Sequence, residues 1–158
     1  MRPRPDHPLA WISIALTLAA GVASSSQTES GFLKALRNAR SEVRWQPASE
    51  IAGDFDGDLM ADTAALGYVP DGVVLVIKAT TTNQLHFVDF RVAKDDPDAF
   101  CSVPVRLWRE PLSCAANAGD MPGCKEAPRA SSLALGDGVC KPLNVYWDHE
   151  RHVPAWWR

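Results

Sequence analysis

Four aspartates recur at short intervals in one segment of this chain of 158 residues. Counted from Asp54, carboxylates occupy positions 1, 3, 5 and 9, at Asp54, Asp56, Asp58 and Asp62. Alternating acids on a tight loop direct their oxygens toward one point, and Ca²⁺ takes about six to eight oxygen ligands. A loop of this type adds a backbone carbonyl at position 7, which here belongs to Met60. The segment is therefore predicted to bind Ca²⁺ with weak to moderate affinity.

The charge around this segment favours a cation. No lysine or arginine lies between Arg44 and Lys78, whereas six acidic residues do. Like charges this close raise one another's pKa, and a divalent ion removes the repulsion. Magnesium is less suited, because it retains its waters and demands near-octahedral geometry. The alternative is an acidic turn without an ion, since Asp and Gly favour turns for local reasons.

Two positions distinguish the segment from an EF-hand loop. Position 12 is Ala65, so the bidentate glutamate of an EF-hand is missing. Position 6 is Leu59, where glycine accepts a positive φ without strain. A leucine in the left-handed region costs about 1–2 kcal/mol. Both differences predict a lower affinity than an EF-hand has.

The segment GDFDGDLMADTAAL, with the VVLVI strand that follows it, resembles the calcium-binding signature of FG-GAP/VCBS-type repeats over about residues 50–78. In those repeats the loop usually reads DFDGDG, with a later Asp and then an apolar strand. The resemblance implies a ligand set of four carboxylates and one carbonyl, from Asp54, Asp56, Asp58, Asp62 and Met60. The chain departs from the pattern at Leu59, where Gly is usual.

The C-terminal part carries a second, looser resemblance. Cys114 and Cys124, followed by LNVYWDHERHVPAWW, are similar to the end of small exported bacterial proteins with a single repeat of this type. Repeats of this kind elsewhere build propellers with several blades. One copy cannot close a propeller, so that architecture is not expected here.

The histidines, serines and remaining aspartates are not spaced as they are in known catalytic or metal-binding motifs. His149 and His152 are three residues apart, whereas a zinc-binding HExxH motif needs two His four apart on one helical face, so an exposed turn is predicted. His86 stands alone between apolar neighbours, and no GxSxG motif is present. The remaining acids that can form an acid/base pair are not placed in a catalytic pattern; they are Asp89, Asp95, Asp96 and Asp98. No catalytic residue is assigned.

The cysteines indicate an oxidising compartment. The four are Cys101, Cys114, Cys124 and Cys140, an even number with no CxxC pair, which favours disulfides over zinc. Three pairings are possible. Cys114–Cys124 is favoured, because the residues between them are rich in turn formers, and Cys101–Cys140 then follows by elimination.

The N-terminus has the pattern of an export signal. Arg2 and Arg4 precede an uncharged apolar run, Leu9–Ala23, which is shorter than the ~20 residues of a membrane-spanning helix. Residues 1–23 are predicted to be a signal peptide and residues 24–30 a flexible leader. The alternative is a retained membrane anchor. Export predicts a periplasmic or secreted protein with no membrane span after cleavage.

The remaining chain, residues 31–158, is predicted to be a single α+β domain: a small antiparallel β-rich domain with one N-terminal helix, cross-linked by disulfides. Apolar residues at helical spacing predict a helix over Gly31–Trp45, capped by Ser30 and stopped by Pro47. Alternation and turn signals predict strands over Ser49–Gly53, Thr63–Tyr68, Val73–Lys78, Leu85–Val92, Val103–Trp108, Ser131–Leu135, Leu143–Trp147 and His152–Trp157.

Composition limits the functions that remain. With 46% hydrophobic and 22% charged residues the chain is neither a disordered tail nor a rod, and a net charge of −3 gives no nucleic-acid footprint. Four aromatic residues are candidates for a binding patch that takes a protein or glycan, the alternative being that they cap the sheet: Tyr146, Trp147, Trp156 and Trp157. The sequence thus predicts an exported, calcium-stabilised binding module with an unknown envelope partner, such as an inhibitor or immunity factor. The alternative is a periplasmic hydrolase with unidentified catalytic carboxylates.

Overall fold

The structure, a computed structural model, describes residues 30–115 and 121–158. The predicted signal peptide and the predicted leader up to residue 29 lie outside the described residues. Within the described ranges one helix is followed by strands in two antiparallel sheets, so the predicted α+β class is confirmed. The helix α1 is Gly31–Ala39, and a single 3₁₀ turn, η1, covers Pro47–Ser49. No helix in these ranges has the length and hydropathy that a membrane crossing requires.

The two sheets are formed from consecutive parts of the chain. Sheet 1 has the order β1-β3-β4-β5, and β2 pairs with the remaining part of β3. Its strands are β1 (Arg44–Trp45), β2 (Ile51–Gly53), β3 (Asp62–Val69), β4 (Gly72–Ala79) and β5 (Gln84–Arg91). Sheet 2 has the order β6-β7-β8-β9. Its strands are β6 (Arg106–Pro111), β7 (Ser131–Gly136), β8 (Leu143–Asp148) and β9 (Val153–Trp157).

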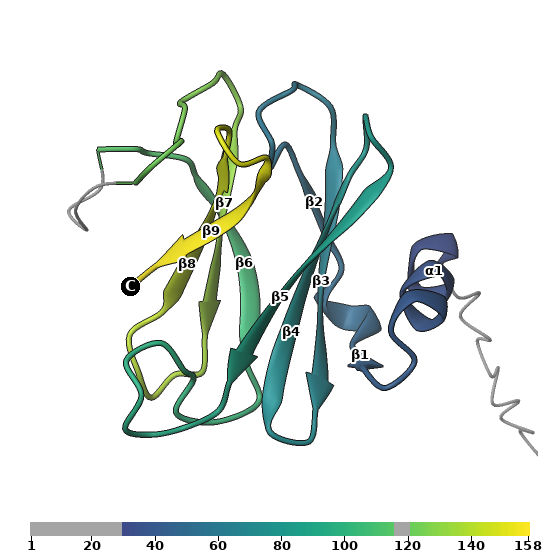
Figure 1. Ribbon diagram of the computed structural model, residues 1–158, viewed down its shortest axis with the longest axis vertical. Helices are drawn as coiled ribbons and strands as arrows, with labels where there is room; N and C mark the ends of the chain where they lie inside the picture. The colour runs from purple at the N-terminus through teal and green to yellow at the C-terminus, as the bar shows by residue number, and fades with distance from the viewer. Residues whose placement is uncertain (1–29, 116–120) are drawn as a thin grey trace, which may run out of the picture.

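Sheet 1 is the middle layer of three, with α1 on one face and sheet 2 on the other (Figure 1). Strand β4 shows the consequence, because side chains alternate between the faces of a strand and both of its faces are buried. Val74 and Val76 pack toward the helix. Val73, Leu75 and Ile77 pack toward sheet 2. Burial on both faces explains why this strand is a continuous apolar run.

Helix α1 is shorter than predicted. Ser30 caps it as expected, its hydroxyl accepting a hydrogen bond from the Leu33 N–H at 3.2 Å. The helix ends at Ala39, however, and β1 replaces its predicted C-terminal part. Val43 and Trp45 are two residues apart, so an extended backbone places both in the core between α1 and sheet 1. Burial of these two side chains therefore outweighs the helical spacing of the segment.

Gly67 makes this packing possible. It lies opposite Trp45 in the β1–β3 pairing. A Cβ atom at this position would lie 2.8 Å from Cε3 of Trp45 and closer still to Cγ1 of Val43. The missing side chain therefore provides the space that Val43 and Trp45 occupy.

Strand β6 begins three residues later than predicted, at Arg106 instead of Val103. Pro104 has no N–H to contribute to a ladder. The backbone of Val105 is bonded to the Tyr68 hydroxyl, which accepts from its N–H at 3.0 Å and donates to its carbonyl at 3.1 Å. The contact with Tyr68 in sheet 1 thus takes the place of strand pairing at the start of β6.

Two disulfides join the connections between strands, with the pairing that the sequence favours. Cys101–Cys140 links the β5–β6 connection to the β7–β8 connection, with the two Cα atoms 5.9 Å apart. Cys114–Cys124 lies between β6 and β7, with a Cα separation of 5.8 Å. No cysteine in the described chain is free. Such cross-links are typical of proteins from oxidising, non-cytosolic compartments.

Each disulfide is expected to stabilise the fold by an amount that increases with the logarithm of the number of residues in the loop that it closes. The bridges span 39 and 10 residues. Replacing Cys101 and Cys140 together by Ser should lower the free energy of unfolding by about 4 kcal/mol, and replacing Cys114 and Cys124 by about 3 kcal/mol. Urea denaturation of the two double variants measures both values. A larger loss from the shorter bridge would contradict the chain-entropy explanation.

Candidate metal centre

The acidic loop, residues 54–61, connects β2 to β3 and is held at its base by both sheets. Gly53 and Asp62 pair across β2 and β3, which closes the loop. The Ser131 N–H, at the start of β7, donates to the Asp54 carbonyl at 2.8 Å. The Phe55 ring is 3% exposed and belongs to the core between the sheets. Packing on both sheets therefore positions the first residues of the loop.

Asp54, Asp56 and Asp58 form the candidate metal centre. One carboxylate oxygen from each lies within 4.8 Å of the others, a grouping that can hold a metal ion. Asp54 is buried and Asp56 is half-buried, so the group is only partly accessible to solvent. All three residues were singled out from the sequence.

Hydrogen bonds within the loop produce this grouping. The Asp54 carboxylate accepts from the backbone N–H of Gly57 at 2.8 Å and of Leu59 at 3.1 Å. Asp56 accepts from the Asp58 N–H at 3.2 Å. Asp58 itself accepts a further bond from the next turn of the loop, from the N–H of residue 60 at 2.7 Å. Each carboxylate thus curls the following residues back toward itself, the local behaviour of Asp in turns.

Asp62 has a different position from the other three aspartates. It is fully buried, and it is not a member of the group of three. One oxygen accepts from the N–H of Phe55 at 2.9 Å and of Asp56 at 3.3 Å, and the other accepts from the Thr80 N–H at 2.8 Å. Asp62 therefore fixes the backbone of the acidic loop and joins it to the β4–β5 turn.

The predicted carbonyl ligand belongs to Met60. This residue lies in the outer part of the loop, with its side chain 52% exposed and its N–H donated to Asp58. The Met60 N–H thus helps to form the turn between Asp58 and Met60.

Negative charge is poorly compensated at Asp56. Burial, together with the nearby carboxylates of Asp62 and Asp58, raises its pKa to about 6. Burial also raises the pKa of Asp62. The pKa of Asp58 is lowered instead, chiefly because the Thr81 hydroxyl donates a hydrogen bond to it. A cation at this position would remove the repulsion that Asp56 experiences.

A cavity of about 360 Å³ adjoins the acidic loop and contains a group that the sequence did not predict. It is lined by Asp56 and Asp58 together with His86, His149 and His152. The histidines come from β5 and from the β8–β9 hairpin, and these meet the acidic loop at one end of the sandwich (Figure 1). The predicted turn at residues 149–152 is confirmed as this hairpin.

Two of these histidines have specific contacts. The ring of His149 lies against the loop, so that a Cβ on Gly57 would be 3.4 Å from its Cε1. The ring of His86 meets Trp147 edge-on, with centroids 4.8 Å apart. Burial lowers the pKa of both imidazoles. In the described residues, only the three aspartates bring three ligand atoms close enough for a metal, so the histidines do not form a second centre of that kind.

The four aromatic residues of the predicted patch are not equally accessible. Tyr146 and Trp147 are 5% and 7% exposed, whereas Trp156 is 37% exposed. Trp156 packs against Phe90 in the core, and Trp157 packs against Tyr146. The two adjacent tryptophans therefore lie on opposite faces of β9, as expected for neighbours in a strand. Both of them contribute to packing.

Comparison with known protein families, with curated proteins and with solved structures finds no match for this chain.

Leu59 is predicted to strain the acidic loop. Its φ of 72° lies in the left-handed region, and its side chain is 62% exposed. Leu59→Gly should therefore raise the free energy of unfolding by about 1 kcal/mol, because relief of ~1–2 kcal/mol of backbone strain exceeds the added entropy of the unfolded chain.

Urea denaturation without added metal measures this change. Leu59→Ala is the matched control, since alanine keeps the backbone penalty and should give no gain. Equal stabilisation by both substitutions would show that the side chain, and not the backbone angle, is unfavourable.

Proposed function

We propose that this protein is an exported, calcium-stabilised binding module that recognises a protein or glycan of the cell envelope, in the manner of an inhibitor or immunity factor. The observation that carries the proposal is the convergence of Asp54, Asp56 and Asp58 on a loop held by both sheets. Neither the partner nor the activity is assigned by relatives, so the proposal depends on the chemistry of this loop.

The donors of the loop suit calcium. They are carboxylate oxygens, which hard cations prefer, and no thiolate or imidazole belongs to the group of three in the described chain. Asp54, Asp56 and Asp58 would hold the ion, with the carbonyl of Met60 as a further donor and water completing the coordination. Asp62 would support these ligands through the backbone that it fixes.

A bound ion would supply charge neutralisation and rigidity at one end of the sandwich. Extracellular modules bind calcium with Kd values of ~10⁻⁴–10⁻³ M, so millimolar calcium would contribute about 1 kcal/mol to stability. The loop contacts β7 in sheet 2 as well as β2 and β3 in sheet 1, so an ordered loop would stabilise the contact between the two sheets. The ion itself need not take part in any reaction.

Export is supported by two independent features. The disulfides are typical of oxidising compartments. The first residues of the chain have a basic start and an apolar core of signal-peptide length. Together they favour a periplasmic or secreted protein.

A hydrolase is the second candidate function, and the cavity beside the acidic loop favours it. Asp56, with its pKa raised to about 6, faces the same cavity as His86, His149 and His152. A carboxylate with a raised pKa and an imidazole are both groups that can exchange protons with a substrate. The other candidate acids have different partners: Asp89 pairs with Arg40, and Asp96 with Arg91.

Calcium is expected to stabilise the wild-type protein. At pH 7.5, where Asp56 is ionised, 5 mM CaCl₂ should raise the Tm by roughly 4 °C, and excess chelator should reverse the change. Asp56→Ala combined with Asp58→Ala should abolish the response. Differential scanning calorimetry with a calcium titration measures both.

Two further variants make this test specific. Asp56→Asn with Asp58→Asn keeps oxygen acceptors for the loop hydrogen bonds but removes both charges, so it should also lose the response. Asp71→Ala, in the β3–β4 turn, removes a charge elsewhere and should respond as the wild type does. An unchanged response in the loop variants would place the ion elsewhere.

Calcium also separates the two candidate functions, because Asp56 cannot be an ion ligand and a proton donor at once. A hydrolase that uses Asp56 should cleave glycan, peptide or ester substrates, lose activity in Asp56→Asn and be inhibited by calcium. A binding module should show no turnover while calcium still stabilises it.

A further inference from the structure

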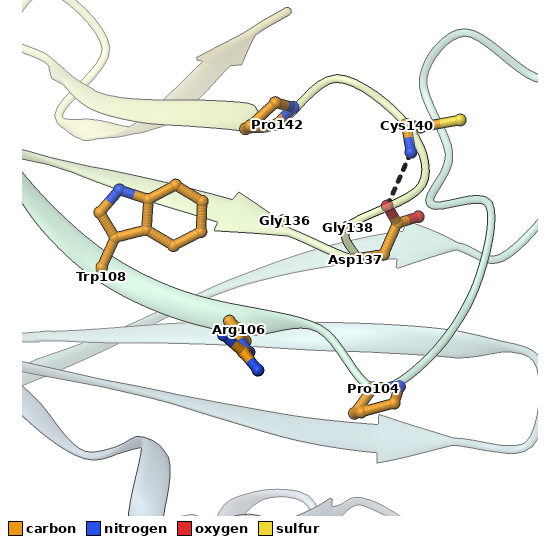
Figure 2. A pocket seen from close by; sticks show the side chains of 8 residues that line it. All are labelled: Pro104, Arg106, Trp108, Gly136, Asp137, Gly138, Cys140 and Pro142. Carbon is orange, nitrogen blue, oxygen red and sulfur yellow. Dashed lines mark hydrogen bonds between the residues drawn. The ribbon is translucent and has the colours of Figure 1, made fainter.

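We propose that a cavity at the other end of sheet 2 binds a small carboxylate attached to a six-membered ring, with Arg106 binding the carboxylate and Trp108 stacking on the ring. This site is separate from the acidic loop and does not require calcium. The cavity has a volume of about 680 Å³, within the range typical of small-molecule sites. Its walls include Pro104, Arg106, Trp108, Gly136, Asp137 and Pro142 (Figure 2).

Arg106 and Trp108 lie on the outer face of β6. They are two residues apart on one strand, so their side chains project from the same face of sheet 2. Figure 2 shows both at the cavity, with Pro104 and Pro142 on different sides of it. Two proline rings and an indole give the cavity apolar walls, and Arg106 adds a cation among them.

The ring of Trp108 is fixed in an accessible orientation. Gly136 lies beside it, and a Cβ at that position would be 2.9 Å from Cη2 of Trp108. The indole therefore packs directly on the backbone of Gly136, where a side chain would clash with it. Its Nε1–H donates to Glu110 at 2.7 Å, which orients the ring. Because the side chain remains 36% exposed, a flat ligand can stack on it without rearrangement.

The acid that lines the cavity is already fully hydrogen bonded. Asp137 accepts from the backbone N–H of Val139 at 2.8 Å and of Cys140 at 2.9 Å through one oxygen. Through the other it accepts from Cys101 at 2.6 Å and Ser102 at 3.0 Å. Burial acts to raise the pKa of Asp137, but these four N–H donors outweigh it and hold the pKa below its usual value.

Arg106 is consequently free to bind a ligand. It is exposed and, within the described residues, forms no ion pair with a carboxylate. The disulfide Cys101–Cys140 joins the two connections on which Asp137 and its donors lie, so this wall of the cavity is held in place. The cavity thus presents a guanidinium on a rigid support.

These features together define the ligand class. A guanidinium binds a carboxylate through two parallel hydrogen bonds, and an indole face stacks on aromatic rings and on the C–H face of a pyranose ring. Aromatic acids and hexuronic acids share this chemistry. Benzoate and glucuronate are therefore the probes, with benzyl alcohol and glucose as their uncharged counterparts.

The test is a ¹H–¹⁵N NMR titration that follows the Trp108 indole N–H, performed in excess chelator so that calcium plays no part. At least one of the two acids should shift this signal in a saturable manner, and its uncharged counterpart should bind at least tenfold more weakly. The acid that binds identifies the source of the ring. If neither acid shifts the signal at 20 mM, or if charged and uncharged probes bind equally, the proposal is wrong.

Variants assign the contacts. Arg106→Gln should weaken binding about tenfold, and Arg106→Lys should retain part of it, because lysine keeps the charge but not the planar fork. Lys34→Gln, on α1 behind sheet 1, removes one positive charge from an exposed position and should bind as the wild type does. Unaltered binding by Arg106→Gln would overturn the assignment. Since the titration excludes calcium, failure here leaves the proposed calcium function intact.

Discussion

The buried carboxylate of Asp62 determines the architecture at one end of the sandwich. A buried charge is strongly unfavourable unless hydrogen bonds compensate for it, and Asp62 obtains them from Phe55, Asp56 and Thr80. The first two bonds set the course of the acidic loop, which brings Asp54, Asp56 and Asp58 together. The third bond holds the β4–β5 turn next to that loop, where the following residue, Thr81, donates to Asp58. The candidate metal centre thus depends on an aspartate outside the group.

The layered fold separates two kinds of chemistry. At one end, the acidic loop, the β4–β5 turn and the β8–β9 hairpin bring carboxylates and imidazoles together. At the other end, Arg106 and Trp108 lie on the outer face of sheet 2, beside connections that a disulfide holds. The strands between the two ends pack around one buried apolar core. One end is therefore suited to a cation and the other to an anionic ligand.

Local sequence patterns predicted most of the fold. The apolar run of β4, the Ser30 cap and the disulfide pairing follow from short-range chemistry, and the structure has all three. The end of α1 was not predictable from spacing, because it depends on the space above Gly67, a residue distant in sequence. The candidate site divides in the same way. Four aspartates look equivalent in the sequence, and only tertiary contacts distinguish Asp62 from the others. The convergence of the histidines likewise depends on strand pairing and has no local signal.

The two cross-links leave one layer of the molecule without a covalent restraint. Every bonded cysteine follows β5. The segment of α1 and β1 is held without a disulfide, by the pairing of β1 with β3, by apolar packing and by the Arg40–Asp89 pair. Because no disulfide restrains this N-terminal segment, its local unfolding would expose the outer side chains of β4 without breaking a cross-link. Amide hydrogen exchange would then be fastest in α1 and slowest in the strands that face each other. The disulfides thus restrain the part of the chain that follows β5 and leave the N-terminal segment to non-covalent contacts.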